Sequence, residues 1–418
     1  MKRLLYIAHR LPYPPDKGER SRAFHEIKAL AEHYRITLAA WADDRSADEA
    51  AEALRSWCEK VIVASGGGWR GLARGGWSLL RGRSVTEGYF YSRRLRAALD
   101  AEAEREAFDL ILAYSSGTLP LALAVPARAR IMDLVDVDSA KWAAYADRAP
   151  WPMRWLYRRE AIGVRALERQ ALRRCDAVTV VSDAEIAALS DAGGKATTIG
   201  CGVDLDYFRA SDRQAPPSAS LVFTGTMDYR PNVEGVCWFV REVWPALRRT
   251  VADLTFTIVG RNPAKAVRRL ARQPGIRVTG AVPDVRPHIA SSAVAVAPLR
   301  TARGVQNKVL EAMAMGKPVV ASPPALEGLD VDAGSDVAGA DAPGEWIEQI
   351  GRLLADADLR CRLGQAARTC VEAKYAWAAR MAPLVALCKR LSGAGNDNDS
   401  ESPVASGDSD AMPRRCQA

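Results

Sequence analysis

The sequence has few of the side chains that bind metal ions, and those it has are scattered. It contains only four histidines in 418 residues, and its eight cysteines form no Cys-x-x-Cys pair and do not cluster with the histidines. Regularly spaced cysteines are the pattern expected of structural zinc sites and of disulfide frameworks. Their absence argues against a zinc-binding module and predicts a reduced, cytosolic protein.

The sequence also lacks a long apolar run. A membrane-spanning helix needs about 18 consecutive apolar residues, and no stretch approaches that length. Near the N-terminus, the apolar segment from Leu4 to Ala8 is too short for the core of a signal peptide. We therefore expect no transmembrane segment and interpret residues 3–8 as a buried first strand.

Acidic residues are outnumbered, and two segments hold much of the excess positive charge. The chain has 58 Lys and Arg against 50 Asp and Glu, a net charge of +8. Residues 69–99 and 151–174 each contain seven arginines mixed with aromatic residues. This mixture suits an anionic membrane surface, and it suits a solvated helix face over core aromatics equally well. Nucleic acid is not an expected partner, because no recognised binding motif accompanies the charge.

Short apolar segments alternate with helical segments along most of the chain, which predicts parallel sheets covered on both faces. A chain of 418 residues is long enough for two such domains. We expect an α/β protein with one Rossmann-like domain at 1–212, a second at 218–374, and a disordered tail at 392–418. Predicted strands cover 3–8, 35–41, 60–64, 109–114, 130–134, 177–181, 196–199, 221–223, 254–259, 277–279 and 293–297.

The most informative segment runs from Gly304 to Ser322. It predicts a loop, a helix that ends at Gly316 and a buried strand after Pro318. Helical spacing places a polar face opposite a core face. The polar residues are Gly304, Asn307, Lys308 and Glu311, and the core residues are Val309, Leu310 and Met313.

The start of this helix suits an anion. Unpaired N–H groups and the helix dipole favour negative charge there, and a charge-assisted hydrogen bond from Lys308 would add about 1.5–3 kcal/mol. Glu311, one turn further along, can accept hydrogen bonds from two hydroxyls, as on a ribose. An ordinary amphipathic helix with a solvated Glu311 is the alternative interpretation.

The run from Asn307 to Val320 resembles the C-terminal signature of the family 4 retaining glycosyltransferases, which have the GT-B fold of two facing Rossmann-like domains. The resemblance implies that Glu311 binds the ribose of a nucleotide-sugar donor and that the loop before it binds the diphosphate. The family often has a second glutamate eight positions earlier, where this chain has Arg303. Arg303 replaces a carboxylate that helps hold the donor sugar, and it is a candidate ligand of the diphosphate.

The resemblance implies further donor contacts and a further helix. Gly18 would let the backbone approach the donor phosphates, although a plain turn glycine would look the same. Arg230 is the nearest match to a phosphate-binding cation, and Arg261 lies in a turn that the family places beside the nucleotide base. The helix at 375–391 would return to pack on the first domain.

Asp136 and Asp138 form an Asp-x-Asp pattern, which holds a divalent metal in another glycosyltransferase fold. Three residues recur easily by chance, so we predict no metal. With Ser139 and Lys141, this cluster resembles exopolysaccharide sugar transferases associated with exosortase systems, as does the loop Pro14–Gly18. Asp138, with Lys141, is the candidate catalytic group because its carboxylate could accept the proton of an acceptor hydroxyl. A role as a helix N-cap is the alternative.

The sequence therefore predicts a retaining glycosyltransferase without a cofactor, which transfers a sugar from a nucleotide-diphosphate donor to a lipid-linked (for instance polyprenyl-linked) or exopolysaccharide glycan. It would be cytoplasmic or peripheral on the inner face of the plasma membrane. Many family members carry a histidine near Asp136, and none of the four histidines lies there. A non-hydrolysing nucleotide-sugar epimerase and a catalytically weakened GT-B assembly partner are the alternatives.

Overall fold

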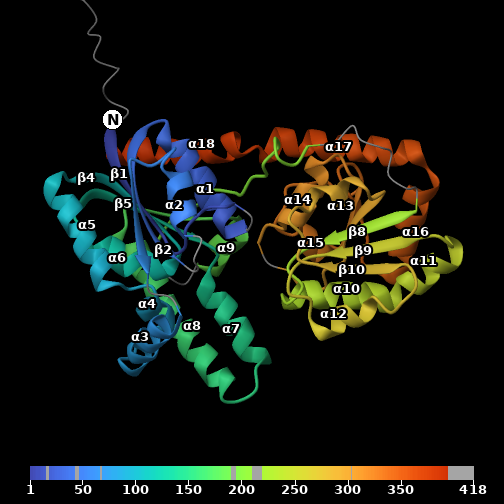
Figure 1. Ribbon diagram of the computed structural model, residues 1–418, viewed down its shortest axis with the longest axis horizontal. Coiled ribbons are helices and arrows are strands. Elements are labelled where there is room, and N and C mark those ends of the chain that lie inside the picture. Colours follow the sequence, from blue (N-terminus) through green and yellow to red (C-terminus); the bar gives the residue numbers. More distant parts are fainter. Residues whose placement is uncertain are drawn as a thin grey trace, which may run out of the picture.

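The structure is a computed structural model that describes residues 1–15, 18–42, 47–65, 68–189, 194–209, 219–302 and 304–393. Two lobes lie side by side, each built on one parallel sheet with helices on both faces (Figure 1). Two long C-terminal helices run along one side of both lobes. Among the described residues, no helix is both long enough and apolar enough to cross a bilayer.

The sheet of the first lobe has the order β3-β2-β1-β4-β5-β6-β7, with parallel pairing throughout. Its strands are β1 (Lys2–Ala8), β2 (Tyr34–Ala42), β3 (Lys60–Ser65), β4 (Phe108–Tyr114), β5 (Ala127–Val135), β6 (Ala177–Val180) and β7 (Ala196–Thr198). Its helices are α1 (Gly18–Ala31), α2 (Ala47–Leu54), α3 (Gly68–Leu80), α4 (Val85–Tyr89), α5 (Arg93–Arg105), η1 (Ser116–Thr118), α6 (Leu119–Ala124), α7 (Asp138–Arg148), α8 (Met153–Arg174) and α9 (Asp183–Ala188).

The sheet of the second lobe has the order β10-β9-β8-β11-β12-β13, again parallel. Its strands are β8 (Ser220–Thr224), β9 (Thr255–Val259), β10 (Ile276–Gly280), β11 (Val294–Ala297), β12 (Val319–Ala321) and β13 (Ala338–Gly339). The helices are α10 (Arg230–Glu242), α11 (Trp244–Thr250), α12 (Lys265–Leu270), α13 (Arg286–Ala290), α14 (Asn307–Ala314), α15 (Pro323–Leu326), α16 (Pro343–Ala355), α17 (Ala357–Tyr375) and α18 (Trp377–Ser392).

The strands are buried on both faces, which explains their continuous apolar sequences. In β1, Leu4 and Tyr6 belong to the core on one face of the sheet, while Leu5 and Ile7 belong to the core on the other. All four side chains are fully buried. The period of two in a strand thus divides one apolar run between two cores.

The last helix packs on the first lobe, as the resemblance implied. Trp377, Met381, Leu384 and Leu387 of α18 join the core on one face of the first sheet. The helix extends one residue beyond the predicted limit, because Ser392 ends α18 and is buried, with its hydroxyl 2.9 Å from the Tyr34 hydroxyl. The predicted tail therefore begins after a structured Ser392, and its residues 394–418 lie outside the described residues.

One helical segment is divided in two where the sequence predicts a continuous helix. The sequence predicts a continuous helix from about Val233 to Leu247, but α10 ends at Glu242 and α11 starts at Trp244. Pro245 causes the break, because proline has no N–H for the bond that would continue the helix. The segment between the two predicted domains, residues 213–217, lies outside the described residues.

Candidate active site between the lobes

The two sheet orders place a site at the carboxyl ends of their central strands. In the first sheet β1 lies between β2 and β4, and in the second β8 lies between β9 and β11, so the strand order reverses at each centre. Parallel α/β sheets bind ligands beyond the carboxyl ends of strands at such points. The first sheet has the predicted Asp136 cluster beyond its strand β5, and the second sheet has the predicted donor loop beyond β11.

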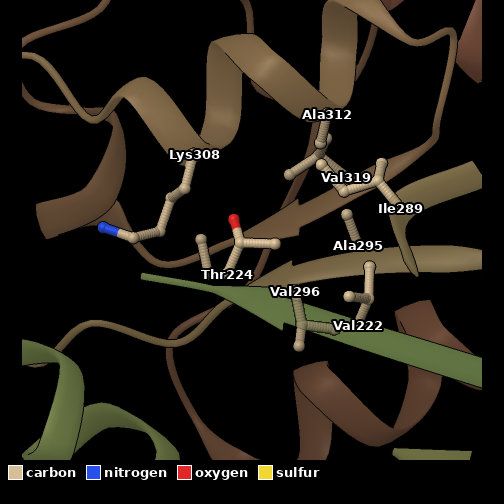
Figure 2. Close-up of a pocket in the computed structure, with 9 residues that line it drawn as sticks. Val222, Thr224, Ile289, Ala295, Val296, Lys308, Ala312 and Val319 are labelled. Atoms are coloured by element: carbon tan, nitrogen blue, oxygen red, sulfur yellow. The ribbon is translucent and has the colours of Figure 1, made fainter. Parts of the chain in front are cut away.

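Helix α14 presents Lys308 at this edge. The preceding loop contains Gly304 with a φ of +64°, a conformation that favours glycine. The Lys308 ammonium donates to the Gln306 side chain at 3.1 Å and lies 5.8 Å from the centre of the Phe223 ring. A small, mostly apolar cavity lies behind it (Figure 2), and the ammonium points away from Ala312, Val319 and Ile289, which line the far end.

Lys308 and Glu311 have opposite charges and are both half-buried. Burial lowers the pKa of Lys308 to about 8, although Glu311 opposes this shift. Burial raises the pKa of Glu311 to about 7, and Lys308 opposes that shift in turn. Within the described ranges, Glu311 forms no hydrogen bond or ion pair. Val309, Leu310 and Met313 are fully buried, which confirms the predicted core face of this helix.

The turns after β8 and β9 pack tightly beside the start of α14. A side-chain carbon on Gly260 would lie only 1.7 Å from the Gly225 carbonyl oxygen, so only glycine fits there. The buried Asn232 donates to the Thr226 carbonyl at 2.9 Å, and its side-chain oxygen has no partner among the residues that the structure describes. Sequence analysis gave Asn232 no role, since nothing in its local pattern marks it as buried.

Of the three arginines predicted near the donor, the structure describes Arg230 and Arg261, and their surroundings differ. Arg230, the first residue of α10, is exposed and forms an ion pair with Glu234 at 2.6 Å. Arg261 is half-buried, and its backbone carbonyl accepts a hydrogen bond from Met227, which joins the β8 and β9 turns. Arg303 lies outside the described residues. Gly18 begins α1.

A buried network of charged side chains in the first lobe holds the turn that leads into Asp136. Arg22 lies 2.9 Å from both Asp133 and Glu26, and all three are fully or almost fully buried. Asp133 also accepts hydrogen bonds from the Thr179 hydroxyl and from the backbone N–H of Val135. Val135 has a φ of +67°, which is unusual for a β-branched residue. The network therefore holds the strained turn that leads into Asp136.

Asp136 of the first lobe lies close to the donor loop of the second lobe. A side-chain carbon on Gly304 of the second lobe would lie 3.3 Å from its carboxylate oxygen. Asp136 keeps an exposed side chain, but the protein atoms packed around it displace water and raise its pKa to about 6, helped by Glu185 and Asp138 and opposed by Lys141 and Arg22. The donor loop and the Asp136 cluster therefore share one junction.

Asp138 and Lys141 lie on the first turn of α7. The Lys141 ammonium is 3.9 Å from Asp138, and the Ser116 hydroxyl donates to Asp138 at 3.4 Å. Burial would lower the pKa of Lys141, but Asp138, Tyr145, Asp136 and the second-lobe Tyr229 outweigh it and raise that pKa. The N-cap interpretation of Asp138 is wrong: Val137 is the cap residue, and no side-chain cap bond forms.

The structure also places a histidine at the carboxyl edge of the first sheet that sequence analysis did not assign. His9 follows β1 and stacks on Tyr114, the last residue of β4, with ring centroids 5.6 Å apart. It comes from a different strand than the family histidine, so linear position alone could not reveal it. Across the described ranges, no group of three or more His, Cys, Asp or Glu side chains could hold a metal ion.

Two family models match the chain, one in each lobe. The model for Glycosyltransferase Family 4 matches residues 21–207, and the model for Glycosyl transferases group 1 matches residues 218–356. A search of curated proteins found no match. Asp136, Asp138 and Lys141 lie within the first match, and Lys308 and Glu311 lie within the second, whereas His9 and Gly18 precede both.

Solved structures show the same fold at low sequence identity. Sucrose-phosphate synthase from Thermosynechococcus elongatus is 17% identical, with a TM-score of 0.68 and 94% and 100% of the two chains covered. HepE from Anabaena, solved with UDP-glucose, is 15% identical with a TM-score of 0.61 and coverages of 93% and 99%. WaaG, a glycosyltransferase involved in lipopolysaccharide biosynthesis, is 15% identical with a TM-score of 0.61 and coverages of 91% and 99%. The chain has the GT-B fold and is a nucleotide-sugar glycosyltransferase of the group 1 and family 4 type.

Proposed function

We propose that this protein is a retaining glycosyltransferase that transfers a sugar from a nucleotide-diphosphate donor to a hydroxyl of a lipid-linked or exopolysaccharide glycan. One observation carries the proposal: the loop that opens α14 lies against Asp136 of the first lobe. A donor held by Lys308 and Glu311 would therefore present its sugar at the Asp136, Asp138 and Lys141 cluster.

The second lobe supplies the groups that a leaving nucleoside diphosphate needs. As the bond to the sugar breaks, negative charge grows on the diphosphate, and a fixed cation in a site with little water stabilises that charge strongly. Lys308 is such a cation, and the N–H groups at the start of α14 add to it. Glu311 would accept hydrogen bonds from the ribose hydroxyls. This assignment needs no metal ion.

The first lobe supplies the acceptor side. Asp138 and Lys141 form a neighbouring pair of opposite charge on the first turn of α7. Such a pair can hold a polyhydroxyl acceptor by hydrogen bonds to both charges, which orients the attacking hydroxyl. An acceptor linked to a lipid would keep the enzyme at the inner face of the plasma membrane as a peripheral protein.

UDP-sugars are the first donors to test, since the Anabaena neighbour was solved with UDP-glucose. Thermal shift with UDP-, GDP- and ADP-sugars should identify the donor as the one that raises the melting temperature. Transfer is then measured with that donor and a glycan acceptor. Turnover of the donor without any acceptor would instead indicate an epimerase, and donor binding without any turnover would indicate an assembly partner.

A further inference from the structure

Exposed hydrophobic side chains are concentrated on one part of the first lobe. Of the eleven large hydrophobic side chains that are exposed in the described residues, three lie on α3 and four lie between residues 151 and 162. Leu80 is 80% exposed and Trp151 is 83% exposed. Single exposed hydrophobic residues are ordinary, but a cluster of this size marks an interaction surface.

The two segments form one continuous surface, here called the docking face: α3, the turn 81–84 and residues 151–162. Any side-chain carbon on Gly163 would collide with Ser84, and one on Gly82 would lie 3.4 Å from Arg159. The carboxylate of Glu160 accepts hydrogen bonds from the first N–H groups of α4, which fixes the turn on α8. In Figure 1, α3, α7 and α8 project from the side of the first lobe opposite α18.

The charge of the docking face has one sign. Residues 71–84 and 151–159 contain six arginines and no acidic residue. Glu160, which follows, is only 3% exposed, and its carboxylate accepts a hydrogen bond from the backbone of Val85. Arg81 lies over the Trp77 ring at 4.9 Å, and Trp155, Arg158 and Ile162 are spaced to share one face of α8. Aromatic and cationic side chains therefore alternate over the same area.

We propose that the docking face binds an anionic phospholipid bilayer. Tryptophans favour the level of the lipid headgroups, and arginines attract anionic headgroups from the adjacent surface. A protein partner would need acidic groups matched one by one to the arginines, whereas a bilayer matches a scattered cationic surface without fixed positions. This inference deepens the proposed lipid-linked acceptor, but its test does not depend on turnover.

Helix α7 connects the docking face to the active site. Its first turn carries Asp138 and Lys141. Its last residue is Arg148, which shortly precedes the segment 151–162 of the docking face. Eleven residues of helix span about 16 Å. The active site would therefore lie a short distance above the lipid headgroups, within reach of a glycan carried on a lipid.

Co-sedimentation of the full-length protein with vesicles tests this proposal. We expect binding to phosphatidylcholine vesicles that contain phosphatidylglycerol, reversed by salt, and little binding to phosphatidylcholine alone. The double variant Arg81→Gln with Arg158→Gln should partition roughly thirtyfold less, from the loss of two cations. Trp77→Ser with Trp155→Ser should also bind less, because the aromatic contacts are lost.

The matched control is Arg272→Gln, an exposed arginine on the second lobe, which should bind vesicles like the wild type. Donor binding by thermal shift shows that each variant is folded. Three results would overturn the proposal: equal binding to neutral vesicles, no binding to anionic vesicles, or an equal loss of binding in the Arg272→Gln variant. If transfer activity is never found but the vesicle results hold, only the proposed function fails.

A second, independent observation concerns the two aspartates at the junction. Asp138 is already engaged with Lys141 and Ser116. Asp136 forms no hydrogen bond or ion pair with any described residue and lies against Gly304 of the donor loop, while its side chain stays accessible to solvent. The strained turn at Val135, which is held by a hydrogen bond to Asp133, places Asp136 beside this loop.

From this geometry we infer that Asp136, and not Asp138, accepts the proton of the acceptor hydroxyl. The O–H bond of the acceptor breaks and its proton moves to the Asp136 carboxylate. The bond from the anomeric carbon to the diphosphate oxygen breaks and its electron pair leaves with the nucleoside diphosphate, while the acceptor oxygen forms its bond to that carbon on the same face, so that the configuration is retained. Asp136 afterwards releases the proton to water. This inference rests on the proposed function.

Its surroundings suit that role. The charged groups that act on Asp136 are Glu185 of α9, Asp138 and Lys141 of α7 and Arg22 of α1. Displacement of water by the surrounding protein and the two carboxylates raise its pKa to about 6, which leaves the group ionised at neutral pH and able to take a proton readily. Activity should therefore fall as pH decreases through about 6.

The test compares Asp136→Asn with Asp138→Asn. Asp136→Asn should lower kcat about 100-fold or more with unchanged donor affinity, and it should lose the acid limb of the pH profile near 6. Asp136→Glu should restore part of the rate. Asp138→Asn should keep that acid limb. Wild-type kcat in Asp136→Asn would overturn the inference, as would loss of the acid limb only in Asp138→Asn. Absence of any transfer by the wild type would instead refute the proposed function.

Discussion

His25 stacks face to face on Trp377, with ring centroids 4.6 Å apart and planes inclined by 12°. His25 belongs to α1 of the first lobe, and Trp377 begins α18, the helix that returns from the second lobe. The contact therefore helps to hold α18 against α1 of the first lobe. Burial lowers the pKa of His25 to about 4, and Asp204 opposes the shift, so the stacked ring is neutral at neutral pH.

This neutral histidine should make the protein sensitive to acid. An unfolded histidine has a pKa near 6.5, so between about pH 6.5 and 4 the unfolded chain binds a proton that the folded chain does not. The free energy of unfolding should therefore decrease by up to about 3 kcal/mol as pH falls through this window. Urea unfolding at several pH values measures it. The His25→Phe variant keeps the stacking and should lose this part of the pH dependence; an identical pH dependence in both proteins would contradict the prediction.

Gly364 of α17 should tolerate no side chain. A side-chain carbon there would lie 2.2 Å from the carbonyl oxygen of Gly316, just beyond the end of α14. Gly364→Ala must push α14 and α17 apart, which should destabilise the protein by about 1–3 kcal/mol and weaken donor binding. The matched control is Gly351→Ala in α16, where nothing lies within 4 Å of the added carbon. That change should be neutral or slightly stabilising. Equal melting temperatures for the two variants would refute the assignment.

The local parts of this site were predictable from the sequence, and the contacts between the lobes were not. Gly304, Gly316 and Pro318 mark the ends of a helix whose polar and core faces follow from helical spacing. Strands such as β1 are buried on both faces, so they can likewise be recognised in the sequence as continuous apolar runs. In contrast, Asp136 and Gly304 are 168 residues apart in the chain, and no local pattern reports that they meet.

Chelation of metal ions should leave transfer activity intact. We expect the diphosphate charge to be met by Lys308 and by the backbone N–H groups of α14, which EDTA cannot remove. The measurement is the rate of sugar transfer after dialysis against EDTA, with and without added manganese. Complete loss with recovery on adding manganese would instead make Asp136 and Asp138 metal ligands.

Lys308 should control the affinity for the diphosphate. Lys308→Met removes a charge-assisted hydrogen bond worth about 1.5–3 kcal/mol, so the Kd of the donor should rise by roughly 10-fold to 150-fold. Because burial lowers the pKa of this ammonium to about 8, wild-type affinity should also weaken above pH 8, where the deprotonated amine prevails. Calorimetric titrations at pH 7 and 9 test both effects. Lys265→Met, at an exposed lysine of α12, is the control; a pH dependence retained in Lys308→Met would contradict the assignment.

Glu311 should act on the ribose and not on the diphosphate, which separates it experimentally from Lys308. Glu311→Gln keeps the size of the side chain but replaces an ionised acceptor by a neutral amide, so donor affinity should fall about tenfold or more. Since burial raises the pKa of Glu311 to about 7, wild-type affinity should also decrease below pH 7 as the carboxylate takes up a proton. Inorganic pyrophosphate lacks a ribose, so its binding should be unchanged in Glu311→Gln and weakened in Lys308→Met. Wild-type donor affinity in Glu311→Gln would remove the ribose role, and an equal loss of pyrophosphate binding would show that the substitution acts through Lys308.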